Sequence, residues 1–119
     1  MNISPHNSIH ENCSAERLSR ELNALAHPVR LQILSYLTRV NGCCCKDVVC
    51  QFDLAQSTVS QHLKILLEAG LLEMKPQGQR SQYSPNREAL QSLASAVNRL
   101  AAGFAMAPLQ DEQKIQQTV

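Results

Sequence analysis

The 119-residue chain has no tryptophan and only two tyrosines and two phenylalanines. A hydrophobic core must therefore be aliphatic, and apolar residues make up 44% of the sequence. No run of about 18 apolar residues exists, which excludes an obvious membrane-spanning helix. The first twelve residues lack the apolar segment of a secretory signal. These absences predict a single, mainly helical domain in the cytoplasm, without contact to a membrane.

Excess charge of either sign is also missing, because the formal net charge is only +1. That balance does not by itself predict nucleic-acid binding. The distribution is more informative, since Lys75, Arg80 and Arg87 occur in a segment without acidic residues. A dimer would double this local positive patch, so the low net charge does not exclude DNA as a partner.

The cysteines of the chain are arranged unusually. There are five, and three of them are consecutive: Cys43, Cys44 and Cys45. An odd number with three neighbours is a poor disulfide framework for a secreted domain. The pattern favours free, reactive or ligand-binding thiols in a reducing compartment.

The most informative segment runs from residue 55 to 72. Apolar residues recur there at steps of three and four, as expected for one buried helix face: Val59, Leu63, Leu66 and Leu67. Gly70 then ends the helix. Amide, hydroxyl and ammonium groups occupy the opposite face, at Gln56, Ser57, Ser60, Gln61 and Lys64. Such groups hydrogen-bond base edges and phosphates, so the segment predicts a helix that reads a DNA groove.

The neighbouring segments predict the rest of a winged helix-turn-helix, in the order α-α-α-α-β-β-α. Helices are expected over 15–26, capped by Ser14, and over 28–40, followed by a short helix from the cysteine run to Phe52. After Gly70 the apolar period changes to two, which predicts a hairpin wing around Gln77-Gly78. The fold is thus mainly α with a small β-hairpin. The domain is expected over 14–106, with flexible segments at 1–13 and 107–119.

The last predicted helix, residues 87–104, carries an apolar stripe at alternating three- and four-residue steps. The stripe consists of Leu90, Leu93, Val97, Leu100 and Phe104. It could pack on the domain's own core or on a second copy. A dimer interface is favoured, because paired DNA half-sites require a two-fold partner.

Three motifs in order, "LAHPVRLQIL", "LAQSTVSQHLKILLEAGLL" and "QGQRSQYSPN", resemble the ArsR/SmtB family of bacterial repressors over residues 15–104. The resemblance implies a homodimeric winged-helix repressor, not an enzyme, that sits on double-stranded operator DNA and leaves when an inducer binds. It also implies the residues that face DNA: Gln56, Ser57, Thr58, Ser60, Gln61 and Lys64, with Arg80 reaching from the wing.

The same resemblance bears on the inducer. Arsenic-sensing members carry Cys-x-Cys followed by Asp-Leu in the third helix. Cys44 and Asp47 match that motif, but Lys46 takes the place of the second thiolate, and a Cys-x-Cys at Cys43 and Cys45 is offset by one residue. The zinc and nickel sites of the family need His and acidic residues on the last helix, which here offers only Glu88.

Two kinds of thiol chemistry are therefore expected, and neither requires a resident cofactor. In the first, trivalent arsenic or antimony binds three thiolates, two from Cys43, Cys44 and Cys45 and a third from Cys13 or Cys50. In the second, a peroxide oxidises the cluster, since a helix N-terminus and Lys46 would favour thiolate. A disulfide between adjacent cysteines would be strained and easily reduced.

Other interpretations of the thiols are weaker. Cys50 follows two valines and could be a buried apolar filler. A thiol enzyme or metal carrier would need Cys-x-x-Cys, or a cysteine with a supporting His and acid, and neither pattern is present. His62 lies between Val59 and Leu66 and is interpreted as a packing or phosphate contact, not as a metal ligand.

Overall fold

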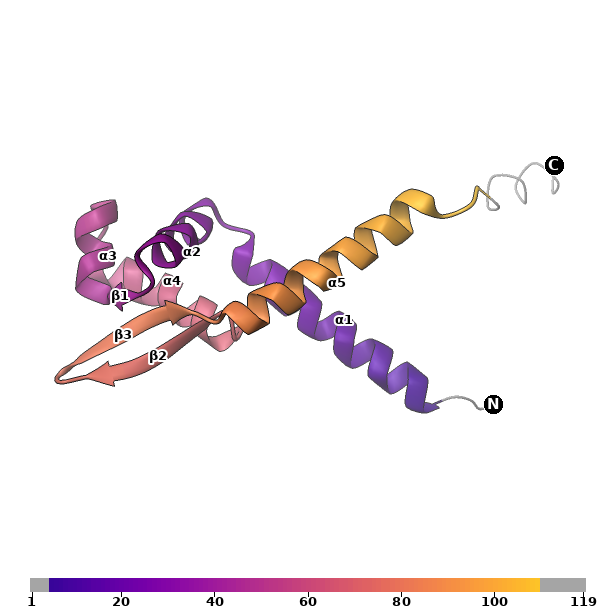
Figure 1. The fold of residues 1–119 in the computed structure, drawn as a ribbon, viewed down its shortest axis with the longest axis horizontal. Coiled ribbons are helices and arrows are strands. Elements are labelled where there is room, and N and C mark those ends of the chain that lie inside the picture. Colours follow the sequence, from indigo (N-terminus) through magenta and orange to yellow (C-terminus); the bar gives the residue numbers. More distant parts are fainter. Residues whose placement is uncertain (1–4, 110–119) are drawn as a thin grey trace.

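The computed structural model describes residues 5–109, and the side chains of residues 15–109. In this part of the chain it has the expected mainly helical winged helix-turn-helix fold, with one additional short strand (Figure 1). The elements are α1 (Pro5–Leu25), α2 (Pro28–Val40), β1 (Cys43–Cys44), α3 (Cys45–Phe52), α4 (Gln56–Glu68), β2 (Leu72–Gln77), β3 (Arg80–Pro85) and α5 (Arg87–Met106).

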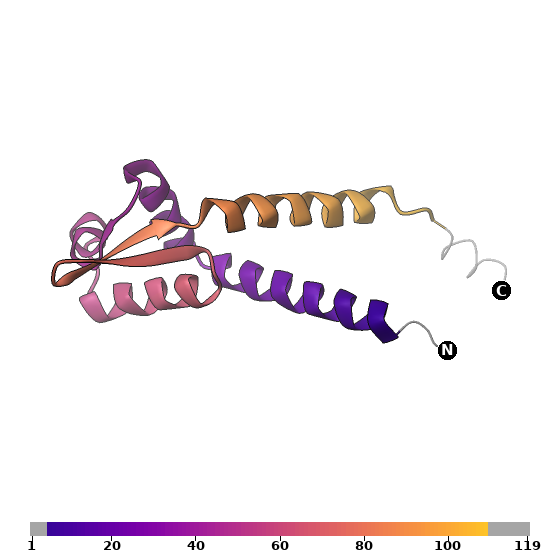
Figure 2. The ribbon, with the colours of Figure 1, turned by 60° about the horizontal axis from the view of Figure 1, so that its bottom comes forward.

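Two long helices extend from one end of a compact head. The head contains α2, α3, α4 and the sheet, and Figure 2 shows α1 and α5 leaving it in the same direction. Helix α1 begins at Pro5, ten residues before the expected start at Ala15, so residues 5–13 are helical where a flexible segment was predicted. Proline suits the first turn of a helix, and no glycine or second proline interrupts the segment that follows.

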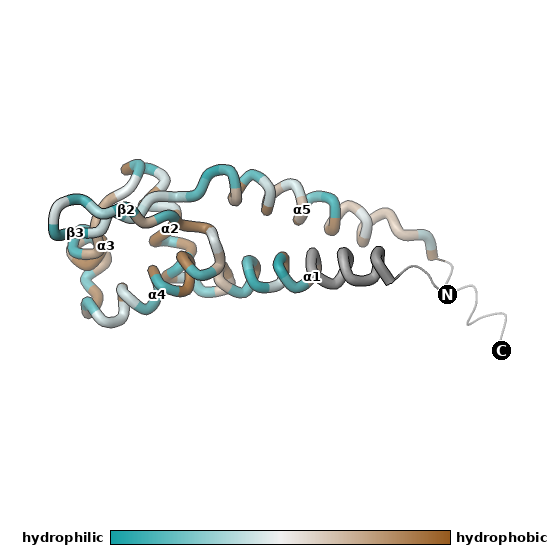
Figure 3. The backbone as a smooth tube through the Cα atoms, turned by 90° about the horizontal axis from the view of Figure 1, so that it is seen from below, coloured by the Kyte–Doolittle hydropathy of each residue, from teal (hydrophilic) through white to brown (hydrophobic). Residues whose placement is uncertain are grey.

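The core lies inside the head and is aliphatic, as the composition requires. The hydrophobic stretches of α2 and α4 lie close together at its centre (Figure 3). Its most completely buried side chains are Ile33, Leu37, Val48, Val59, Leu63, Leu66 and Leu71. Val40 is 43% exposed, because it is the last residue of α2 and the chain turns away at Asn41, whose φ is 60°.

The three strands form one antiparallel sheet in the order β1-β3-β2. Strands β2 and β3 are the predicted wing, with Leu72 opposite Pro85 at its base and Gln77 opposite Arg80 at its tip. Strand β1 was not predicted, since two residues are too few to show an alternating pattern. Gly42 permits its close approach, because a Cβ there would lie only 3.0 Å from the carbonyl oxygen of Tyr83.

The reading helix α4 ends as predicted but begins differently. Gly70 has a φ of 82° and its N–H donates to the carbonyl of Leu67, which terminates the helix. At the start, Ala55 is the N-cap and provides no side-chain hydrogen bond. Asp53, which precedes α4, forms the left-handed C-cap of α3 with a φ of 53° and does not cap α4.

Candidate nucleic-acid interface and thiol cluster

Helix α4 separates its two faces as the sequence predicts. Its apolar face is buried at Val59, Leu63 and Leu66, whereas Leu67, expected on the same face, is only half-buried. Every residue expected to face DNA on this helix is exposed: Gln56, Ser57, Thr58, Ser60, Gln61 and Lys64. The arrangement presents six polar side chains along α4, five of them in its first half and the cation Lys64 in its second half.

The wing supplies exposed positive charge beside this helix. Arg80 is the first residue of β3 at the hairpin tip, two residues after Gly78 with its φ of 63°, and Lys75 is exposed on β2. Arg87 behaves differently from these two cations. Its guanidinium donates to the Thr38 carbonyl at 3.3 Å and to Asn41 Oδ1 at 3.4 Å, so it ties α5 to α2.

The three adjacent cysteines lie between the wing and α4, and the fold divides them. Cys43 and Cys45 pack against the hydrophobic core. The Cys44 thiol instead donates to Asp47 Oδ2 at 3.1 Å, and its backbone N–H donates to the same oxygen at 3.3 Å. Cys44 also lines a small cleft of about 250 Å³ together with Gly42, Cys43, Asp47, Gln77, Arg80, Ser81 and Gln82.

Electrostatics differ from the sequence expectation at Cys43. Burial, and then the negative charge of Asp47, raise the pKa of the Cys43 thiol to about 11. The hydrogen bonds from Cys44 hold the pKa of Asp47 below its ordinary value. The expectation that a helix N-terminus favours the thiolate is therefore wrong for Cys43, because that residue lies in β1 and outside α3.

One contact joins the thiol cluster directly to the reading helix. The Cys45 sulfur lies 3.6 Å from the Ser60 hydroxyl oxygen, within hydrogen-bonding distance for sulfur. The two residues are fifteen apart in sequence, and the packing of α3 on α4 brings them together. Sequence reasoning selected both residues separately but could not pair them, because no local spacing encodes this contact.

Two further thiols, Cys13 and Cys50, were expected as possible ligands. Cys50 is exposed on α3, which contradicts its interpretation as a buried filler. Since α3 begins only at Cys45, helical spacing does not place Cys43 and Cys50 on one face. The side chain of Cys13 lies outside the described residues. Across residues 15–109, no group of three or more His, Cys, Asp or Glu side chains is arranged to hold a metal ion.

His62 belongs to a buried polar contact on the inner side of α4. It is 9% exposed, its Nδ1 lies 3.4 Å from Arg30 Nη1, and its ring centroid is 4.7 Å from that of His27. Burial, and then the nearby His27 and Arg30, lower its pKa. His27 Nδ1 meanwhile accepts the Val29 N–H and caps α2. The histidine thus has packing and hydrogen-bonding partners, in line with its interpretation from sequence.

The apolar stripe on α5 changes character along the helix. Leu93 is 6% exposed, and Leu90 and Val97 also pack against the core. Leu100 and Phe104 are 40% and 73% exposed. A groove of about 1070 Å³ separates this end of α5 from α1 and is lined by residues that include Leu18, Leu22, Ala96 and Leu100. The first half of the stripe serves the core of the single chain, and the second half remains uncovered.

No helix within residues 5–109 is long and apolar enough to cross a membrane. The fold and the exposed reading helix define a winged helix-turn-helix regulator. The family model "Bacterial regulatory protein, arsR family" matches residues 27–74, from the cap of α2 to the first half of the wing. The "Arsenical resistance operon repressor" of Bacillus subtilis (strain 168) is 35% identical over 79 residues, covering 66% of this chain and 75% of that protein. The chain belongs to the arsR family of regulators.

Solved structures agree on the fold. An ArsR-like transcriptional regulator from Rhodococcus sp. RHA1 has a TM-score of 0.70 at 21% identity, covering 89% of this chain and 95% of its own. The homodimeric winged helix-turn-helix DNA-binding domain Mb0332 from Mycobacterium bovis has a TM-score of 0.67 at 24% identity, covering 87% and 91%. The Bacillus subtilis protein is named as a repressor, and the two solved structures as an ArsR-like and a possible ArsR-family transcriptional regulator.

Proposed function

We propose that this protein is a homodimeric transcriptional repressor that binds operator DNA through α4 and the β2–β3 wing, and that chemistry at its cysteines releases it. The observation that carries the proposal is the exposed polar face of α4, opposite a face whose Val59, Leu63 and Leu66 are buried, in a member of the arsR family. Relatives named as arsenical resistance operon repressors support repression as the outcome of DNA binding.

The start of α4 supports a phosphate contact as well. Ala55 offers no capping side chain, so the first N–H groups of the helix have no side-chain acceptor there. Helix N-termini of this kind attract phosphate oxygens. With Lys64 and Arg80 nearby, the helix start would position the protein on the DNA backbone, and Gln56 and Gln61 would contact base edges.

Dimerisation is supported by the uncovered part of α5. Leu100, Phe104 and, across the groove, Leu22 are exposed at 40%, 73% and 39%. A second copy would cover this surface and place two reading helices on successive half-sites. The Mycobacterium bovis domain of the same fold is described as homodimeric, which agrees with this assembly.

As inducer we propose trivalent arsenic or antimony. Thiolates are soft ligands that select such ions, and Cys43 and Cys45 lie on the same, core-facing side of the cluster. A third ligand would come from Cys44 or from Cys13. Oxidation of the same cysteines by peroxide is the alternative, with Cys44 or Cys45 as the attacking thiol, because the raised pKa disfavours Cys43.

The experiment is a DNA-binding titration with a fragment from upstream of the protein's own gene. Wild type, the Cys43→Ser/Cys44→Ser/Cys45→Ser variant and the control Cys50→Ser are titrated with arsenite and with hydrogen peroxide in separate series. We expect arsenite to release wild type and the control but not the triple variant. Release by peroxide alone would favour the oxidative alternative, and normal release of the triple variant by both would exclude the cluster as the sensor.

A further inference from the structure

We propose that Ser60 couples the thiol cluster to the DNA-reading surface, as the residue through which ligation of Cys45 weakens operator binding. This inference rests on the proposed function and specifies how the signal leaves the cysteines. The 3.6 Å contact between Cys45 Sγ and Ser60 Oγ carries it. Within the described side chains, no other cysteine sulfur has a hydrogen bond to α4.

The position of the two residues suits such a role. Cys45 opens α3 directly after β1, so a change at its sulfur occurs where strand and helix meet. Ser60 follows Val59, which is fully buried, so the backbone of α4 is held in place at this point. Its hydroxyl is exposed on the same side as Ser57 and Lys64. Ser60 therefore touches the thiol cluster and also lies on the surface expected to meet DNA.

The chemistry of ligation must alter this contact. When arsenite, As(OH)₃, binds a thiol, an As–S bond forms and an As–O bond breaks, and the thiol proton leaves with the hydroxyl group as water. No electron is transferred. If the Cys45 thiol donates to Ser60, the bond loses its donor. If Ser60 donates to the sulfur, the acceptor is weakened, because arsenic then shares the sulfur lone pairs.

Either outcome changes what Ser60 presents to DNA. The hydroxyl is freed from the sulfur, and the arsenic, with its remaining hydroxyl or thiolate ligands, is held beside the exposed face of α4. Both effects act at a residue next to Gln61, in the middle of the proposed reading surface. The structure thus provides a direct route from the thiol to the DNA contacts that does not require α4 to unfold.

The test compares two serines one turn apart on the same helix. Ser60→Ala removes the contact with Cys45, whereas the control Ser57→Ala removes an exposed hydroxyl that has no side-chain hydrogen bond within residues 15–109. Arsenite binding is followed by the ultraviolet absorbance of As–S bonds. Operator affinity is measured without and with saturating arsenite, and the quantity compared is the ratio of the two dissociation constants.

We expect arsenite to weaken operator binding of wild type and Ser57→Ala about tenfold or more, within the usual range of coupling between sites. In Ser60→Ala the ratio should fall to about twofold or less while arsenite still binds, and Ser60→Thr, which restores a hydroxyl, should recover most of it. An unchanged ratio in Ser60→Ala overturns the inference alone. Failure of wild type to bind arsenite overturns the proposed inducer together with it.

Discussion

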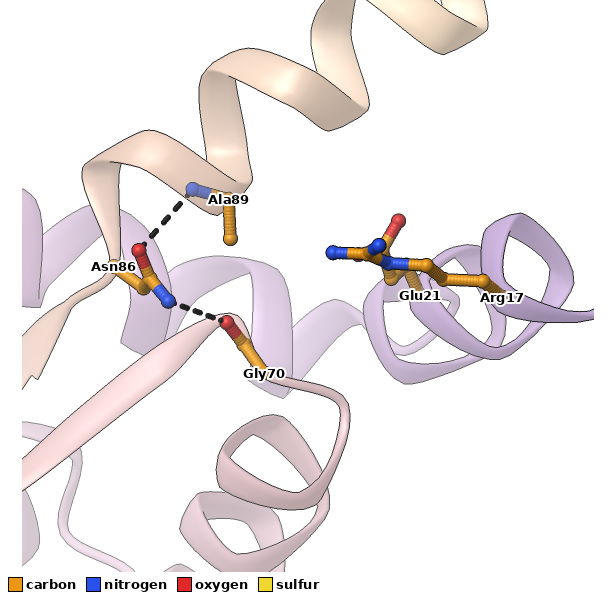
Figure 4. A network of polar contacts seen from close by, with 5 residues as sticks. All are labelled: Arg17, Glu21, Gly70, Asn86 and Ala89. Carbon is orange, nitrogen blue, oxygen red and sulfur yellow. Dashed lines mark hydrogen bonds and ion pairs between the residues drawn. The ribbon is translucent and has the colours of Figure 1, made fainter. Parts of the chain in front are cut away.

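Asn86 holds the end of the reading helix and the start of α5 together through Gly70. Its side-chain Nδ2 donates to the Gly70 carbonyl at 3.1 Å, while its Oδ1 accepts the Ala89 N–H at 3.1 Å and caps α5 (Figure 4). Its backbone N–H donates to the Leu71 carbonyl at 2.9 Å. The side chain and backbone of Asn86 therefore join the turn after α4 to the start of α5, the helix proposed for dimerisation.

Replacing this residue should destabilise the whole domain. Asn86→Ala removes a helix cap and the hydrogen bond to Gly70, which together are worth about 2 kcal/mol. We expect the urea midpoint to fall accordingly. Asn98→Ala is the matched control, since Asn98 is exposed on the same helix. Equal midpoints for the two variants would show that the Gly70 contact is energetically unimportant.

The salt dependence of operator binding should separate Lys64 and Arg80 from Arg87. Removing one phosphate contact lowers the magnitude of the slope of log K against log salt by about one. We expect this loss for Arg80→Ala and for Lys64→Ala. Arg87→Ala removes the same charge from a side chain that is bonded to α2, and should leave the slope unchanged. Identical slopes for Arg80→Ala and wild type would remove Arg80 from the interface.

Stability should fall in mild acid because of His62. Its pKa is lowered in the folded protein by burial and by the proximity of His27 and Arg30, so the unfolded chain takes up the proton first. The contribution is fully present above the ordinary value of 6.5 and is lost as the pH falls through the folded pKa. Urea unfolding at pH 7.5 and pH 5.5 measures the loss. The His62→Gln variant should show a smaller difference between these two pH values than wild type, and an equal difference would assign the effect to other groups.

The cysteines should differ in their reactivity with iodoacetamide. Only the thiolate reacts, and a pKa of about 11 leaves Cys43 almost entirely protonated at pH 8. Cys50 is exposed and serves as the internal reference. Mass spectrometry of peptides from timed samples should find Cys43 modified more slowly than Cys50. Equal rates would mean that burial does not protect Cys43 in solution.

The exposed end of α5 should control the oligomeric state. Burying a phenylalanine is worth about 1.5–3 kcal/mol, so Phe104→Ser should weaken dimerisation about tenfold or more. Sedimentation across a concentration series provides the measurement. Asn98→Ser, on the same helix, is the control. A monomeric wild-type protein would contradict the dimer itself, and an unaffected Phe104→Ser dimer would place the interface elsewhere.

The sequence predicted most of this architecture, because its largest elements have strong periodic patterns. The two faces of α4, the stop at Gly70 and the wing around Gly78 follow from spacing and turn chemistry alone. Element boundaries without such signals were missed. The start of α1 has no breaker to mark it, and β1 has two residues and depends entirely on pairing with β3.

The candidate site was predictable residue by residue but not as an arrangement. Spacing selected Ser60 and the cysteines, yet the contact of Cys45 with Ser60 depends on the packing of α3 against α4. The protonation of Cys43 likewise depends on burial, which local sequence did not indicate. The exposure of Cys50 was missed for the same reason. The two valines before it suggested that it would be buried, but of these three residues only Val48 is fully buried.

The pairing of β1 with the middle strand has a consequence for the affinity of the inducer. Cys43 is opposite Tyr83 and Cys44 is opposite Gln82, on the strand that begins with Arg80 at the wing tip. Coupling between two ligands is reciprocal. If thiol ligation lowers the affinity for DNA by some factor, bound DNA lowers the affinity for the inducer by the same factor. A molecule bound to its operator would then bind the inducer only at a higher concentration than a molecule without DNA.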